Sequence, residues 1–226
     1  MHFGHLLDRI NLDTVAEGAS MTARPIPHIT EEEYLQRERA SIIKHEYYAG
    51  HSYAMAGASE QHNLIAMNVA ALLRIHLRGS SFRAYPSDMC LKVVTTGLNT
   101  YPAFTVVCGS SQFVNPEKRD TLINPTVIIE ILSPSIESYD RGVKFQHYRT
   151  IETLREYILI SQDKYYIERY IRQENNEWIL SDAVGIEATL PIIAIQANMP
   201  LAEIYEQVTF VPTVPPLCHA RVEDDR

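Results

Sequence analysis

The chain has 226 residues, 46% of them hydrophobic and 21% charged, and a formal net charge of −8 at pH 7. That length and composition are typical of one globular domain with a sizeable core, and they exclude a chain that is disordered throughout. The negative charge argues against a protein that coats nucleic acid nonspecifically, but it is compatible with a nuclease whose cleft is locally basic.

Hydropathy and cysteine content bear on where the protein resides. No apolar run approaches the ~18–20 residues of a membrane span, so we expect no membrane association. The three cysteines, Cys90, Cys108 and Cys218, have neither the spacing of a disulfide framework nor that of a zinc site. We expect Cys90 and Cys108 to be buried in strands and the protein to be cytoplasmic.

The chain divides into one domain and two terminal segments. Residues 1–20 have no sustained periodicity, and Met21 could be a second start, so this segment is interpreted as a leader or a disordered N-terminus. Residues 21–211 form the predicted domain. Residues 212–226, which are Pro-rich and then charged, are predicted to be a flexible tail.

Capping and turn signals place the first elements of the domain. Thr30 followed by Glu33 forms a capping-box pattern, which predicts a helix that runs toward Ala40. A turn signal between two aromatic-rich arms predicts a hairpin over residues 44–56. Ser59 is expected to cap a helix that reaches about residue 78.

The rest of the domain is expected to alternate strands with loops and short helices. Residues 82–96 are predicted to form one or two strands and residues 104–108 another. Residues 109–124 are predicted to be a loop long enough to act as a surface lid or to shield a cleft. The remaining predicted elements are strands 127–132, 157–161, 167–172 and 178–181, a helix 141–149 capped by Asp140, and a short helix after Pro200.

The run from Val127 to Leu132 is interrupted by Glu130. Its β-branched residues predict a strand buried on both faces, where a carboxylate is costly unless it is paired, hydrogen-bonded or bound to a metal. On the following helix, Arg141, Lys144 and Tyr148 have the i, i+3, i+7 spacing of one face. A strand carboxylate facing a helix lysine is a combination suited to cleaving a phosphodiester bond.

Several of these segments together resemble a known family. Pro102 before a strand, the segment Glu130-Ile131-Leu132-Ser133-Pro134-Ser135, and Tyr139-Asp140-Arg141-Gly142 with Lys144 and Tyr148 are similar to the Uma-type restriction endonucleases of the PD-(D/E)XK superfamily. The resemblance extends over roughly residues 30–210. It implies an α/β (α+β) restriction-endonuclease-like core, with a mixed central sheet flanked by helices, and Mg²⁺- or Mn²⁺-dependent cleavage of DNA.

The resemblance also implies roles for individual residues. Glu130 would be the second metal ligand, and Lys144 would replace the lysine that the superfamily usually places two residues after the glutamate. Ala103 occupies the catalytic position of the first metal ligand, where the family has aspartate. The loss of that carboxylate predicts an inactivated nuclease, whether engineered or naturally degenerate.

Each of the remaining candidate residues could have a structural role instead of a functional one. Glu46 corresponds to a recurrent family glutamate near the cleft, but it could instead pair with Lys44 or be exposed. His62 matches a family histidine that could contact DNA or position water, although a lone histidine is more often structural. Arg141 and Tyr148 are candidates for substrate binding. Asp88 could supply charge missing at position 103, but a turn role is favoured.

Three functions remain open from the sequence. The first is a Mg²⁺-dependent DNA endonuclease, with a homodimer expected by analogy with its superfamily. The second is a DNA-binding or interaction protein that kept the fold and lost catalysis. The third is a structural oligomeric domain in which Glu130 is a paired core carboxylate.

Overall fold

The structure is a computed structural model that describes residues 28–133 and 136–210. The predicted leader at 1–20, the predicted tail at 212–226 and Cys218 lie outside the described residues. Within them, no helix is long and apolar enough to cross a membrane.

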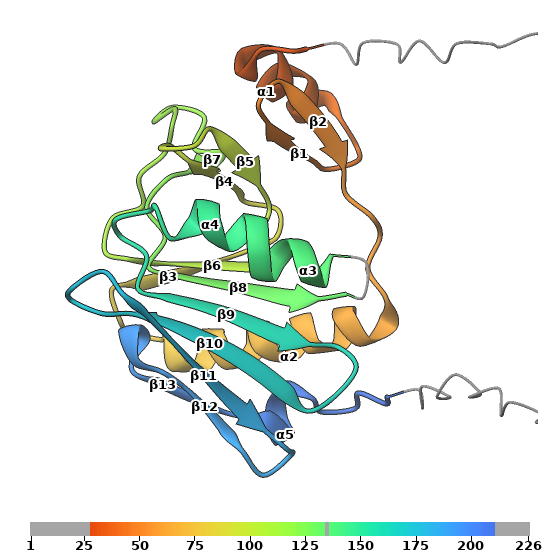
Figure 1. Cartoon of the computed structure of the whole chain (residues 1–226), viewed down its shortest axis with the longest axis vertical. Helices are drawn as coiled ribbons and strands as arrows, with labels where there is room; N and C mark the ends of the chain where they lie inside the picture. Colours follow the sequence, from red (N-terminus) through yellow and green to blue (C-terminus); the bar gives the residue numbers. More distant parts are fainter. Residues whose placement is uncertain (1–27, 134–135, 211–226) are drawn as a thin grey trace, which may run out of the picture.

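A six-stranded mixed sheet forms the centre of the molecule (Figure 1). Its order is β11-β10-β9-β8-β6-β3, and neighbouring strands are antiparallel except for the parallel pair β8 and β9. This arrangement confirms the expected fold class. The strands are β3 (Phe82–Pro86), β6 (Phe104–Cys108), β8 (Val127–Leu132), β9 (Glu156–Ser161), β10 (Tyr166–Arg172) and β11 (Trp178–Val184).

A second sheet has the order β2-β1-β5-β4-β7 and contains the predicted hairpin. Its strands are β1 (His45–Tyr48), β2 (His51–Ala54), β4 (Cys90–Val93), β5 (Leu98–Thr100) and β7 (Thr121–Leu122). Strand β7 pairs with β4 in parallel. The prediction of an uninterrupted loop over residues 109–124 was therefore wrong, because two of its residues complete this sheet.

The helices form layers on the two faces of the central sheet (Figure 1). Helix α2 (Glu60–His76) covers one face, together with a hairpin of β12 (Thr189–Ile192) and β13 (Ala197–Pro200) that the sequence analysis did not assign. The opposite face carries α3 (Glu137–Tyr139), the π-helical turn η1 (Asp140–Lys144) and α4 (Phe145–Tyr148). The remaining helices are α1 (Glu31–Ala40), η2 (Ile193–Ile195) and α5 (Leu201–Ile204).

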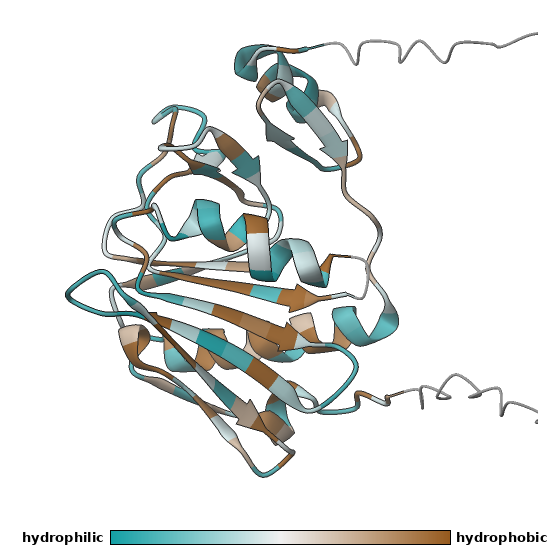
Figure 2. Ribbon diagram, viewed as in Figure 1, coloured by the Kyte–Doolittle hydropathy of each residue, from teal (hydrophilic) through white to brown (hydrophobic). Residues whose placement is uncertain are grey.

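Two hydrophobic clusters fill the space on either side of the sheet, and Figure 2 shows apolar residues along its central strands. In β8, Ile129 and Ile131 belong to the cluster on the α2 side, whereas Ile128 and Leu132 belong to the cluster on the α4 side. Successive side chains of a strand point to opposite faces. Glu130 therefore points toward the α4 layer.

The two cysteines of the described chain differ in exposure. Cys90 is buried in β4, as predicted, but Cys108 is exposed. Cys108 is the last residue of β6, so it lies where the strand leaves the core rather than within it.

The capping box at the start of α1 is present as predicted. The Thr30 side chain accepts a hydrogen bond from the Glu33 amide, and the Glu33 carboxylate accepts one from the Thr30 amide. We expect Thr30→Ala to lower the free energy of unfolding by about 1 kcal/mol in urea denaturation, because one helix-terminal amide loses its acceptor. Thr30→Ser keeps the oxygen and should cost much less. An equal loss in both variants would contradict a capping role.

Candidate active site

Glu130 is buried beneath the α4 layer, with 5% of its surface exposed. Its Oε2 accepts a hydrogen bond of 3.1 Å from the Ala103 amide, and its Oε1 accepts one of 2.9 Å from the Tyr148 hydroxyl. The first contact follows from strand register, because β6 begins at Phe104, which is paired with Ile129. Positions 103 and 130 are therefore adjacent, as the family resemblance implied.

Lys144 is the charge partner of Glu130. Its side chain is 4% exposed, and Nζ lies 3.0 Å from Oε1 of Glu130, 3.0 Å from Oε1 of Glu46 and 3.3 Å from Oδ1 of Asp140. Burial alone would lower the pKa of the Lys144 ammonium, but the three carboxylates outweigh it and raise this pKa well above its usual value. The lysine is therefore charged and fixed in place.

Asp140 does not have the capping role predicted for it. The helical segment already begins at Glu137, and the Asp140 side chain makes no cap hydrogen bond. Asp140 is instead fully buried, on the same side of the π-helical turn as Lys144, with its backbone oxygen accepting a hydrogen bond from the Tyr157 hydroxyl. It is a site residue that the sequence analysis missed, although its i, i+4 spacing from Lys144 was a usable signal.

The charge state of Asp140 predicts a pH effect on stability. Burial, and then repulsion from Glu130, raise the pKa of Asp140 from 3.8 to about 7. Between about pH 4 and 7 the unfolded chain has lost a proton that the folded protein keeps, so this group makes stability fall as pH rises and level off above pH 7. Asp140→Asn should remove that contribution. Urea denaturation of both proteins from pH 4 to 8 should show the parent losing stability relative to Asp140→Asn, and a pH-independent difference would contradict this.

Arg141 does not share the face of Lys144 and Tyr148. Its guanidinium pairs with Glu168 of β10 at 2.9 Å and also with Glu137. Residues 140–144 form a π-helical turn rather than the predicted α-helix, and in this turn Asp140, not Arg141, contacts Lys144. The charge of Arg141 is thus already partnered, and its role in substrate binding stays a prediction.

Glu46 lies beside Lys144, with Oε1 3.0 Å from Nζ and its side chain 13% exposed, so it neither pairs with Lys44 nor is exposed, and its role near the active site stays a prediction. Besides Lys144, its Oε1 accepts a hydrogen bond of 2.5 Å from the Thr100 hydroxyl. Lys44 pairs with Asp88 instead, at 2.7 Å. Asp88 lies in the turn between β3 and β4 with 83% of its side chain exposed, so it supplies no charge at position 103.

His62 lies in the first turn of α2, where Ser59 caps the helix as predicted and accepts a hydrogen bond from the His62 amide. Burial lowers the pKa of the imidazole. Among the described residues, no hydrogen bond or ion pair joins His62 to Glu130 or Lys144. Its role in substrate binding stays a prediction.

Comparisons with known proteins bear on this arrangement. The profile of the Uma2 family, described as “Putative restriction endonuclease”, matches residues 31–200. The chain belongs to the Uma2 family. It is 34% identical over 167 residues to the Synechocystis sp. (strain ATCC 27184 / PCC 6803 / Kazusa) protein slr1290, covering 72% of this chain and 84% of that protein. It is 33% identical over 162 residues to sll1609 of the same organism, covering 72% and 91%.

A solved structure supports the fold. The crystal structure of “a putative nuclease belonging to DUF820” from Anabaena variabilis ATCC 29413 matches with a TM-score of 0.64 and 18% identity, over 78% of this chain and 97% of that one. At that identity the match shows a shared fold.

The side chains present in this Uma2 chain do not fit a divalent cation as they stand. Mg²⁺ prefers oxygen ligands, and Glu46, Glu130 and Asp140 offer carboxylates. However, all three lie within ion-pair distance of Lys144, and Ala103 offers no side-chain oxygen. Across residues 28–133 and 136–210, no three His, Cys, Asp or Glu side chains form a group that could hold a metal ion.

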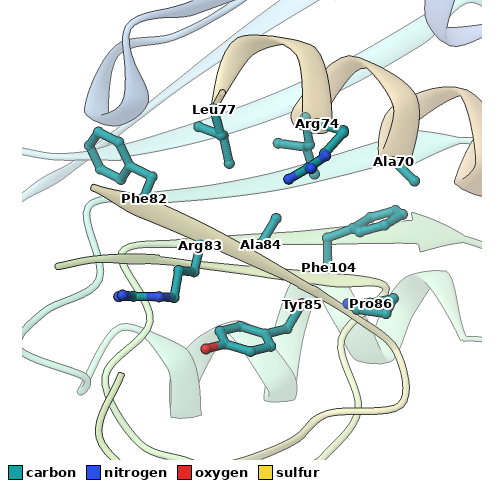
Figure 3. Close-up of a pocket in the computed structure, with 10 residues that line it drawn as sticks. Ala70, Arg74, Leu77, Phe82, Arg83, Ala84, Tyr85, Pro86 and Phe104 are labelled. Carbon is teal, nitrogen blue, oxygen red and sulfur yellow. The ribbon is translucent and has the colours of Figure 1, made fainter. Parts of the chain in front are cut away.

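A cavity of about 430 Å³ lies elsewhere, between α2 and the edge strand β3. Figure 3 shows Leu77, Phe82 and Phe104 gathered in it, with Arg74 reaching in from the helix. None of the residues that line it belongs to the Lys144 cluster. This cavity is therefore separate from the candidate active site.

Proposed function

We propose that this Uma2 chain has the active-site architecture of a metal-dependent DNA endonuclease, impaired by alanine at the first metal-ligand position. The proposal rests on one observation. The Ala103 amide, the Glu130 carboxylate and the Lys144 ammonium come from three separate segments of the chain and are joined by contacts of 3.1 and 3.0 Å. The family resemblance assigns the two metal ligands and the catalytic lysine to these three positions.

The proposed roles follow from the contacts. With an aspartate at position 103, Mg²⁺ held by this residue and Glu130 would supply an activated water and neutralise charge on the phosphate oxygens. Glu130 is held by Tyr148 and by the Ala103 amide, so its carboxylate has a fixed orientation. Lys144 is a fixed positive charge beside it, suited to stabilising negative charge that develops on a phosphate. A second copy of the chain would be needed to cut both strands symmetrically, and we include a homodimer in the proposal.

A second candidate is a DNA-binding or interaction protein without catalysis. It is favoured by alanine in place of a metal ligand at position 103. The two candidates differ in their response to a restored aspartate. Plasmid cleavage by Ala103→Asp in Mg²⁺ supports the impaired nuclease, whereas DNA binding without cleavage by the folded variant supports the second candidate.

A further inference from the structure

The hairpin of β1 and β2 carries an exposed tyrosine beside the candidate active site. Figure 1 shows this hairpin on the same side of the central sheet as α3 and α4. Tyr53 of β2 is paired directly with Glu46 of β1. Side chains of directly paired residues lie on the same face of a sheet, with Cβ atoms about 4.5–5.5 Å apart. Because Glu46 reaches to 3.0 Å from Lys144 Nζ, Tyr53 lies on the hairpin face that meets the site.

The exposure of Tyr53 distinguishes it from its neighbours in the site. Tyr53 is 56% exposed, whereas the side chains of Glu46 and Lys144 are 13% and 4% exposed. Within residues 28–133 and 136–210, its hydroxyl makes no hydrogen bond, and its ring has one aromatic neighbour, His51, with 6.4 Å between ring centroids. The ring of Tyr53 is therefore largely open to solvent beside a buried, charged site.

Packing of the hairpin does not account for this exposed ring. The hairpin is attached through its other face, where the buried ring of Tyr47 stacks on Tyr34 of α1 with 4.9 Å between centroids. On the Glu46 face, Tyr48 is 39% exposed and its ring lies 4.7 Å from that of His147 of α4. Tyr48 follows Glu46 by two residues and so shares its face, next to Tyr53.

An exposed aromatic ring at a site for nucleic acid is suited to stacking on a nucleobase. Every base has a π-face, so such stacking tolerates any sequence. In a duplex, the neighbouring base pairs already cover both faces of each base, and a protein ring can stack only on a base that is unpaired or turned out of the helix. A solvent-exposed ring beside the reacting position therefore selects unpaired nucleotides.

The charge of the protein favours the same class of substrate. Affinity for duplex DNA comes largely from lysine and arginine residues that neutralise phosphates, but this chain has a net charge of −8. In the site itself, Lys144 is already paired with Glu46, Glu130 and Asp140. Stacking supplies affinity for a single strand that does not depend on surplus positive charge.

We propose that Tyr53 is a base-stacking residue of this Uma2 site, and that the nucleotide beside the scissile phosphate is unpaired. The substrate class is then single-stranded DNA, or a locally unpaired segment of a duplex such as supercoiled plasmid contains. This inference rests on the proposed endonuclease function and specifies its substrate.

The first test measures binding to the full chain by fluorescence anisotropy at low salt. The probes are a fluorescein-labelled oligonucleotide of mixed sequence, the duplex of the same sequence, and that duplex with a central unpaired bubble. We expect the single strand and the bubble to bind more tightly than the duplex. Tyr53→Ala should weaken binding of both by roughly 5- to 100-fold, as expected for one lost stacking contact, and leave duplex binding unchanged.

Two substitutions at the same position isolate the ring. Tyr53→Phe keeps the π-face and should bind the single strand as the parent does. Tyr53→Leu keeps an apolar side chain without a π-face and should behave as Tyr53→Ala. Ile179→Ala is the control elsewhere, because Ile179 is 52% exposed on β11, at the edge of the central sheet, and its loss should leave binding unchanged.

Cleavage by the Ala103→Asp variant separates this inference from the proposed function. We expect the single strand and the bubble to be cut faster than the duplex, and Tyr53→Ala in that background to raise KM more than it lowers kcat. Equal cleavage of duplex and single strand would overturn the inference and leave the nuclease in place, as would single-strand binding by Tyr53→Leu equal to that of the parent. Absence of binding and cleavage with every DNA would overturn both.

Discussion

Replacing Ala103 by aspartate is expected to produce Mg²⁺-dependent cleavage of plasmid DNA where the parent shows little or none. The new carboxylate would lie beside Glu130, because the amide of residue 103 already donates to Oε2 of that residue. It would add the second anionic ligand that the parent lacks. We expect a gain of roughly 10²-fold or more in the nicking rate, equivalent to about 2.7 kcal/mol of activation free energy.

Two controls isolate the cause of that gain. Ala103→Asn has nearly the same shape without the charge and should cleave no better than the parent. Adding Lys144→Ala to Ala103→Asp should abolish most of the recovered activity, because the fixed positive charge beside the reacting phosphate is gone. A folded Ala103→Asp protein that leaves supercoiled plasmid intact in both Mg²⁺ and Mn²⁺ would count against the endonuclease proposal.

Glu130→Ala is expected to destabilise the fold strongly. Glu130 accepts hydrogen bonds from the Ala103 amide and the Tyr148 hydroxyl and is an ion-pair partner of Lys144, all in the buried α4 layer. Lys144 keeps Glu46 and Asp140 as partners, but the Ala103 amide and the buried Tyr148 hydroxyl lose their acceptor, at a cost of about 1–3 kcal/mol each. We expect a loss of that order in the free energy of unfolding. It would be measured by urea denaturation, with the same dependence of that free energy on urea concentration (m-value) in both proteins.

Glu130→Gln separates charge from hydrogen bonding. The amide keeps one acceptor oxygen and nearly the same volume, so it should cost less than Glu130→Ala while still weakening the contact with Lys144. If Glu130→Ala cost less than about 1 kcal/mol, Glu130 would not be integral to the buried network. If Glu130→Gln failed to fold and the parent had no affinity for DNA, a structural role for this carboxylate would be favoured over a catalytic one.

Elements with strong local signals were predicted from the sequence. The capping box at Thr30, the cap at Ser59 and the fully apolar flanks of Glu130 correspond to α1, α2 and β8. These signals are local because a cap or a buried strand is specified by residues only a few positions apart. The proximity of Ala103, Glu130 and Lys144 was anticipated through the family resemblance, since spacing alone does not set the pairing of β6 with β8.

The features that were missed depend on tertiary context. Nothing local indicates that residues 140–144 form a π-helical turn, which moves Arg141 onto Glu168 and Asp140 toward Lys144. Strand β7 has two residues and exists only because β4 lies beside it. A strand of that length carries no periodicity, so a loop was the natural prediction. Asp140 is likewise held by a tertiary contact, because its backbone oxygen accepts a hydrogen bond from the Tyr157 hydroxyl.

Calorimetric titration of Mn²⁺ into Ala103→Asp, beside the parent and the double variant Ala103→Asp/Glu130→Gln, tests most directly whether positions 103 and 130 form one metal site. We predict one bound Mn²⁺ per chain for Ala103→Asp, none for the parent, and a loss of binding in the double variant, because both carboxylates would be needed. Equal binding by the parent and Ala103→Asp, or binding that survives Glu130→Gln, would contradict the assignment of these two positions as metal ligands.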